Sequence, residues 1–376
     1  MNSKTIINYD TPWEEILDAA KQPLPGQQAG GPCAKTVMRG LLTDEELTAL
    51  AGIPICTVDI TQAPPALPDI NSDNPERGSF LRKQAEEKNW PFADYMYWPQ
   101  VGTNPCSSVS RRYLKAGNSP AMPKERSAKS GNYGSEFDLR PPLSHRLDGD
   151  MIPVLAVIAS NHDTGQEYFQ DKTCHPEDQH VLTQLHEMFH TLQLQDSTTN
   201  DPLLSRVREE RDAEQGALTA FQTHFGGSPT VAARSILART TSLLLNTSAS
   251  YYFWPGLQGH NLQDGTLIAG SLFVKGMYIQ NNSPVPDGRL IAQAVLHHAG
   301  IMPPSIYQEC KNDIDPVRNF VASQIEEKGS TASLQGVFRL LGTRNSNLTP
   351  AQADLGKKVL QAAAITNPGL LKAYPG

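Results

Sequence analysis

The chain has 376 residues, of which 39% are apolar, and it carries a formal net charge of −7 at pH 7. That length is enough to bury a core as one large domain or two, and the acidic balance gives no general reason to expect nucleic acid as a partner. No segment reaches the roughly 18 consecutive apolar residues of a membrane-spanning helix, so we expect no membrane span.

The cysteine content and the first residues of the chain indicate the cellular compartment. The five cysteines are widely spaced and form no CxxC pair, which argues against a disulfide framework or a cysteine zinc site and favours a reducing compartment. Residues 1–10 lack a basic segment followed by an apolar run, so no secretory signal peptide is visible. We expect a cytoplasmic protein, or one secreted by a route that needs no signal peptide.

Proline is concentrated in the first 150 residues and glycine is plentiful there, and we assign residues 1–75 to a loop-rich N-terminal region with short helices. Thr11-Pro12-Trp13-Glu14 and Thr43 to Glu46 both follow the capping-box pattern, in which a threonine and a glutamate three residues later satisfy the first backbone N–H groups of a helix. Residues 53–60 are a candidate strand.

One basic region follows, formed by Arg111, Arg112, Lys115, Lys124, Arg126 and Lys129. The simplest interpretation is a solvated loop. The alternatives are a docking surface for an acidic substrate or, less simply, for a phosphate backbone.

The stretch from Met151 to Ala159 is short, apolar and rich in Val and Ile, which predicts a strand. Pro153 lies near its start. Because proline cannot donate a ladder hydrogen bond, it indicates an edge strand or a position where the chain enters the sheet.

The strongest chemical signal is His186-Glu187-Met188-Phe189-His190, an HExxH motif within a predicted helix that opens at Pro176. Histidines four residues apart lie on one face of a helix, so His186 and His190 can both bind one metal ion. Zn²⁺ accepts imidazole, and a catalytic zinc keeps three protein ligands and a water. Glu187 is then placed to take a proton from that water.

A second helix is predicted from Pro202, and it supplies the candidate third ligand. Its apolar stripe includes residues 203, 207, 217 and 221, and Glu210 and Glu214 fall on the same face. A buried carboxylate needs a metal or a cationic partner. We therefore assign Glu210 as the third ligand, with Glu209 as its rival, and Glu214 as a carboxylate that orients a ligand histidine. Salt bridges to Arg206 or to another helix are the alternative.

The rest of the chain carries helical patterns. We expect helices over residues 230–245, 270–279, 290–298, 317–327, 333–341 and 350–365, the last capped by Thr349.

The HExxH motif followed by a glutamate-bearing helix resembles the zinc metallopeptidases called gluzincins, of which thermolysin is a member. Glu210-Arg211-Asp212-Ala213-Glu214 is also similar to the Glu-x-x-Ala-Asp box of membrane-associated and Oma-type gluzincins, with Glu in place of the final Asp. Asp196 stands where metzincins carry a third histidine, which argues against that branch. The resemblance covers about thirty residues and identifies no subfamily.

This resemblance implies an α+β fold with a zincin-like core, a small mixed sheet and an active-site helix, which we place over residues 76–300. The helical patterns that follow predict a mainly helical lobe over residues 301–376. The resemblance also implies that a protein or peptide substrate pairs with an edge strand, for which Val154 to Ser160 is the candidate.

The expected function is that of a zinc-dependent endopeptidase in which Glu187 activates zinc-bound water. A donor for the developing oxyanion is also needed, and the candidates are Tyr251, Tyr252 and His260. Two alternatives stay open: a non-catalytic binding protein with a zincin fold, and a zinc hydrolase with a non-peptide substrate. A secreted effector acting on a host protein is a further hypothesis.

Overall fold

The structure is a computed structural model of the chain. It describes residues 6–24, 42–52, 55–59, 83, 86–89, 135–139, 146–147, 150–151, 155–160, 174, 176–192, 202–242, 244, 259–343 and 347–372. In the strands, and at some helical positions, the description covers the backbone alone.

Helices make up most of the described residues. They are α1 (Trp13–Lys21), α2 (Asp44–Ala51), α5 (Pro176–Leu192), α6 (Pro202–Thr223), α7 (Pro229–Ser242), α8 (Leu262–Gln280), α9 (Gly288–His298), α10 (Pro304–Gly342), α11 (Pro350–Thr366) and α12 (Pro368–Lys372). The expectation of an α+β fold is therefore wrong, and the described part of the chain is mainly helical. The expectation gave too much weight to a short resemblance around one helix, whereas most of the buried core lies between helices.

The strands are short and contribute little to this architecture. They are β1 (Ile55–Asp59), β2 (Ser135–Leu139), β3 (Arg146–Leu147), β4 (Asp150–Met151) and β5 (Leu155–Ser160). Three of them form a sheet in the order β1-β5-β2, in which β1 is parallel to β5 and β2 is antiparallel to it. The strands β3 and β4 pair only with each other.

The position of β5 overturns the expected substrate strand. Ile55 to Asp59 pair with Ala156 to Ser160 on one side of β5, and Ser135 to Leu139 pair with the other side. The prediction that Val154 to Ser160 is an edge strand is therefore wrong. A strand whose ladder groups are bonded on both sides has none left for a peptide substrate.

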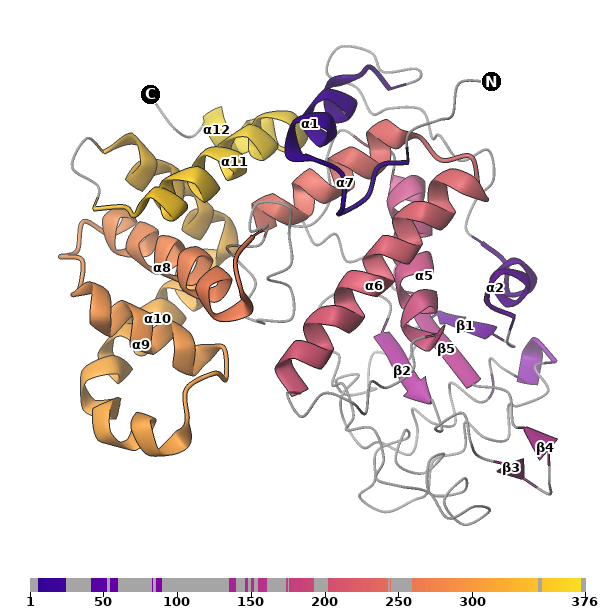
Figure 1. The fold of residues 1–376 in the computed structure, drawn as a ribbon, viewed down its shortest axis with the longest axis horizontal. Helices are drawn as coiled ribbons and strands as arrows, with labels where there is room; N and C mark the ends of the chain where they lie inside the picture. The colour runs from indigo at the N-terminus through magenta and orange to yellow at the C-terminus, as the bar shows by residue number, and fades with distance from the viewer. Residues whose placement is uncertain are drawn as a thin grey trace.

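The elements form successive layers (Figure 1). Helix α5 contacts β2 and β5 on one side and α6 on the other. Helix α7 contacts α6 and is packed in turn against α1 and α11, and α8 lies against α9, α10 and α11. In Figure 1 the sheet with α5 and α6 lies at one end of the molecule and α8 to α10 lie at the other. The boundary expected near residue 300 falls between α9 and α10, which pack against each other.

Close helix contact at the C-terminal end depends on glycine. A Cβ added to Gly276 of α8 would lie 2.6 Å from the backbone nitrogen of Val337, and one added to Gly336 of α10 would meet the backbone of Gly276. The two backbones touch because neither position carries a side chain. This contact joins the two longest described elements of that end, and Val337 and Phe338 are fully buried beside it.

Two of the predicted helix caps are confirmed and one is wrong. Thr43 and Thr349 each accept a hydrogen bond from the backbone three residues later and complete a capping box. The residue before α1 is Pro12, which makes no side-chain cap. The Thr11 hydroxyl instead accepts a hydrogen bond of 3.0 Å from the backbone of Asn8, so it is engaged in the turn that precedes the helix.

The C-terminal helical patterns over residues 317–327 and 333–341 belong to one helix. Helix α10 runs for 39 residues and contains Pro316. Proline lacks the N–H group needed for the helical bond at its own position, and such a loss interrupts many helices. Here the flanking residues Ile314 and Val317 are buried, which holds the helix on its neighbours across the proline. No helix among the described residues is both long and apolar enough to cross a bilayer.

A compact polar group joins α9 to α10. The ring of His297 lies 3.8 Å from that of Tyr307, whose hydroxyl donates to Asp315 at 3.0 Å. Arg318 donates to Asp315 at 2.8 Å and to the Tyr307 hydroxyl at 3.2 Å. Partial burial lowers the pKa of His297, as does the charge of Arg318, while Asp315 acts in the opposite direction.

This lowered pKa predicts a pH-dependent stability. The unfolded chain takes up a proton at a higher pH than folded His297 does, so the free energy of unfolding should fall as pH drops below about 6.5. His297→Phe keeps an aromatic ring against Tyr307 and removes the titration. The difference in melting temperature between about pH 7.5 and pH 5.5 should shrink in this variant, whereas His224→Phe, at an exposed position, should leave it unchanged. An unaltered pH response in His297→Phe would contradict the assignment.

Candidate metal site between two helices

The candidate site lies where α5 packs against α6. Helix α5 buries Val181, Leu185 and Met188, which recur every three or four residues and so form one face of the helix. His186, next to this face, is also buried, with 5% of its surface exposed. A buried imidazole needs polar partners, because an uncompensated polar group in the core is costly.

Two carboxylates of α6 face the two nitrogens of His186. Its Nε2 lies 3.5 Å from Oε2 of Glu210, and its Nδ1 lies 3.7 Å from Oε1 of Glu214. The glutamates are four residues apart, one turn of α6, and both are buried, at 9% and 5% exposure. The structure thus brings together three of the side chains that the sequence placed at the site.

A cation from a third helix completes the cluster. A terminal guanidinium nitrogen (Nη2) of Arg239, in α7, lies 2.6 Å from Oε1 of Glu214. Both side chains are largely buried, at 14% and 6% exposure. Removing one partner of a buried ion pair is costly, because it leaves the other charge uncompensated out of solvent. Glu214 therefore lies between the Nδ1 of His186 and a fixed positive charge.

Tyr9 closes the same region from the amino terminus. Its side chain is buried, at 3% exposure. Burial raises the pKa of the Tyr9 phenol well above its ordinary value; the charge of Glu214 raises it further and that of Arg239 lowers it. The phenol is therefore neutral at physiological pH, and its buried ring lies near enough to Glu214 and Arg239 to respond to both charges.

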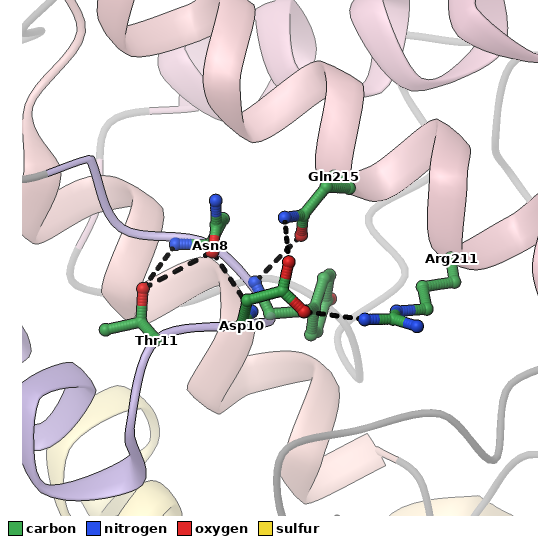
Figure 2. Close-up of polar contacts among 6 residues, drawn as sticks. Asn8, Asp10, Thr11, Arg211 and Gln215 are labelled. Atoms are coloured by element: carbon green, nitrogen blue, oxygen red, sulfur yellow. Dashed lines mark hydrogen bonds and ion pairs between the residues drawn. The ribbon is translucent and has the colours of Figure 1, made fainter.

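Tyr9 belongs to an N-terminal strap, residues 7–11, that lies along α6 (Figure 2). The backbone N–H of Tyr9 donates to Gln215 at 3.0 Å. Gln222, two turns later, accepts from the N–H of Ile7 at 3.0 Å and donates to its carbonyl at 2.8 Å. The two glutamines therefore satisfy backbone groups of a segment that pairs with none of the described strands.

The exposed end of the strap is held by Asp10. In Figure 2 its carboxylate lies between Arg211, at 2.6 Å, and the side-chain amide of Gln215, at 2.9 Å. The Arg211 and Asp10 side chains are 48% and 63% exposed, so this pair contributes at most about 1 kcal/mol. Burial of the apolar side chains of Ile7 and Tyr9, each 3% exposed, stabilises the strap more than this pair does.

A glycine sets the separation of the two site helices. A Cβ added to Gly216 of α6 would lie 2.5 Å from the ring of Phe189, which is part of the HExxH motif. The absence of a side chain lets the Phe189 ring lie directly on the α6 backbone, two residues after Glu214. The approach of α5 to α6 at the cluster depends on this contact.

The remaining predicted site residues are placed as follows. Glu187 and His190 lie in α5 and Glu209 in α6, but their side chains fall outside the described part, and Tyr251 and Tyr252 lie outside it altogether. His260 is exposed in the connection before α8. The structure does not bring it to His186 through any hydrogen bond or ion pair of the described residues.

The described side chains supply two of the donors that a metal ion needs. Among the side chains that are described, no three His, Cys, Asp or Glu residues form a complete metal-binding group. The His186 and Glu210 pair nevertheless has suitable spacing, because two atoms bound to one tetrahedral zinc ion lie about 3.4 Å apart. A third donor has to come from a side chain outside this set, and His190 is the candidate from the sequence.

Sequence reasoning did not identify Arg239 or Tyr9 as part of the cluster. Arg239 lies in a helix whose neighbouring residues Ile236, Leu237 and Thr240 are buried. A cation within such a buried run was the available signal, since it requires an acidic partner. Tyr9 lies far from α6 in the sequence and offered none.

Comparison of the chain with family models, with curated proteins and with solved structures finds no match.

The Gly216 contact yields a prediction. Gly216→Ala should gain about 1 kcal/mol of helix propensity, but overpacking against Phe189 costs about 1–3 kcal/mol, so the free energy of unfolding should fall on balance. Gly288→Ala is the matched control, because nothing lies within 4 Å of a Cβ at that helical position. Chemical denaturation of both variants measures the difference. A Gly216→Ala protein as stable as the Gly288→Ala protein would contradict the close packing.

Proposed function

We propose that the protein is a zinc-dependent hydrolase that cleaves peptide bonds, with its metal held by His186, His190 and Glu210. The observation that carries the proposal is the buried approach of Glu210 to Nε2 of His186, 3.5 Å away, on helices packed side by side. This is the spacing of two ligands around one zinc ion. The HExxH spacing on α5 supplies His190 as the third donor.

The choice of Glu210 over Glu214 rests on which imidazole nitrogen each one faces. Glu210 lies against Nε2, the ring nitrogen farther from the backbone and a common metal-binding atom, whereas Glu214 lies against Nδ1. A histidine that binds metal through one nitrogen commonly donates its other N–H to a carboxylate. The roles of ligand for Glu210 and of orienting partner for Glu214 follow from this difference.

Bound zinc would acidify a coordinated water and polarise a carbonyl group. The contribution of this chain is then to move protons. Glu187 follows His186 in α5 and is the assigned general base, which takes a proton from the attacking water and returns it to the leaving amine. The donor for the oxyanion is proposed to be Tyr251 or Tyr252, because His260 is exposed and makes no polar contact with the cluster within the described part of the chain.

A peptide substrate is supported by the motif and by the outer strands of the described sheet. Among the described strands β1 and β2 are the outer ones. Strand β2 contacts α5, whereas β1 contacts α2. An extended peptide paired with β2 would therefore run beside the helix that carries the HExxH motif.

The ligand assignment is tested by two substitutions at adjacent positions. Glu210→Gln should reduce zinc affinity by at least about 100-fold, because it removes a charged ligand, whereas Glu209→Gln should bind zinc as the wild type does. Competition with a chromogenic chelator measures both dissociation constants. The reverse order of effects would transfer the role to Glu209. The proposal ends if neither variant loses zinc affinity, or if the wild-type protein binds no zinc. His186, Glu214 and Arg239 would then be a structural ion network.

The catalytic assignment is tested at Glu187. Glu187→Gln should retain zinc at one ion per chain and lose hydrolysis by at least about 100-fold, since a general base contributes about that much or more. The substrate is found by mass spectrometry of new amino termini in a proteome exposed to wild type, with the Glu187→Gln protein as the matched control. Cleavages produced equally by both proteins would refute the role of Glu187.

A further inference from the structure

We infer that Arg239 is a positioning residue for the metal site: it holds the Glu214 carboxylate against Nδ1 of His186 and so sets the orientation of the metal-binding imidazole. This inference rests on the proposed zinc site and adds a residue from a third helix, α7, to it.

The geometry of the three groups makes the chain of contacts continuous. The same oxygen of Glu214, Oε1, lies 2.6 Å from Arg239 and 3.7 Å from Nδ1 of His186. The Nε2 of the same ring then lies against Glu210. A shift of the Glu214 carboxylate therefore changes the partner of one ring nitrogen and the direction of the other.

The charges of the cluster explain why a cation is needed there. In the proposed site Glu187 and Glu210 balance the two positive charges of zinc, and Glu214 would then be one negative charge in excess. Arg239 supplies the matching positive charge, and the pair is buried at 6% and 14% exposure. Without a partner, a buried carboxylate takes up a proton or turns towards solvent, and in either case the negative charge beside Nδ1 is lost.

The surroundings keep this pair dry and fixed. Tyr9 is buried beside it, and the charges of both Glu214 and Arg239 act on its phenol. Helix α7 is itself held by α1 and α11, so Arg239 extends from a helix with neighbours on several sides. An arginine also suits the task, because its planar group fixes direction as well as charge.

Arg211 provides a matched control. It too lies 2.6 Å from a carboxylate, but this carboxylate is that of Asp10 in the N-terminal strap and the pair is exposed. Arg211→Met and Arg239→Met therefore each remove a guanidinium group that lies 2.6 Å from a carboxylate. The first pair is exposed and the second is buried.

The experiment measures zinc dissociation constants by chelator competition, with circular dichroism and melting of the metal-free proteins as the folding control. Arg239→Met should weaken zinc binding by about 10- to 100-fold, as is typical of residues behind a metal ligand. Arg239→Lys should recover part of the loss, and Arg211→Met should bind zinc as tightly as wild type. Glu214→Gln should lose about as much affinity as Arg239→Met.

The double variant Glu214→Gln/Arg239→Met decides how Arg239 acts. If Arg239 works through Glu214, the second substitution adds nothing and the losses do not multiply. Three outcomes would overturn the inference while the zinc site stands. These are losses of zinc affinity that multiply in the double variant, an Arg239→Met protein with wild-type zinc affinity, or an equal loss of affinity in Arg211→Met. If Arg239→Met does not fold, Arg239→Lys and Glu214→Gln carry the same comparison. A wild type that binds no zinc overturns the proposed function, and the inference with it.

Discussion

The buried contact of His186 with Glu210 and Glu214 of α6 places the strongest constraint on this structure. Three ionisable groups lie out of solvent within a few ångströms, and two of them carry the same charge. Such an arrangement is stable only when positive charge is supplied from nearby, because desolvated charges that lack partners cost several kcal/mol. Arg239 supplies one such charge. The proposed zinc ion would supply two more, which Glu210 and Glu187 would balance while Arg239 balances Glu214.

The packing around the cluster serves the same end. Gly216 brings the α6 backbone onto the ring of Phe189, which fixes the distance between the helices that carry the histidine and the glutamates. The N-terminal strap then closes the outer side of α6, with Tyr9 inside and the backbone bonded to Gln215 and Gln222. These contacts join segments that are far apart in the sequence. The site is therefore assembled from segments between residues 7 and 239 and not from one motif alone.

Local signals predicted much of the helical structure. Pro176, Pro202 and Pro350 open helices at the predicted residues, and Thr43 and Thr349 form the predicted caps, because these signals depend on neighbours along the chain. Predictions of local structure were wrong where hydrogen bonds or tertiary packing overrode the local sequence signal. The Thr11 hydroxyl accepts a hydrogen bond from the backbone of Asn8 and so does not cap α1. Helix α10 continues through Pro316 because the residues on either side of the proline are buried against neighbouring helices. The α+β class was inferred from one motif, whereas the core formed between helices.

The sequence by itself determined the chemistry available to the site, since the spacing of His186, Glu187 and His190 follows from the period of one helix, and the stripe that carries Glu210 and Glu214 follows from the period of the next. Only the tertiary structure decided which imidazole nitrogen each carboxylate faces, which cation balances Glu214 and which strand lies in the middle of the sheet. The physical reason is the distance along the chain over which each interaction acts. Periodicity and capping act over a few residues, whereas charge compensation and strand order are set by which distant segments pack together.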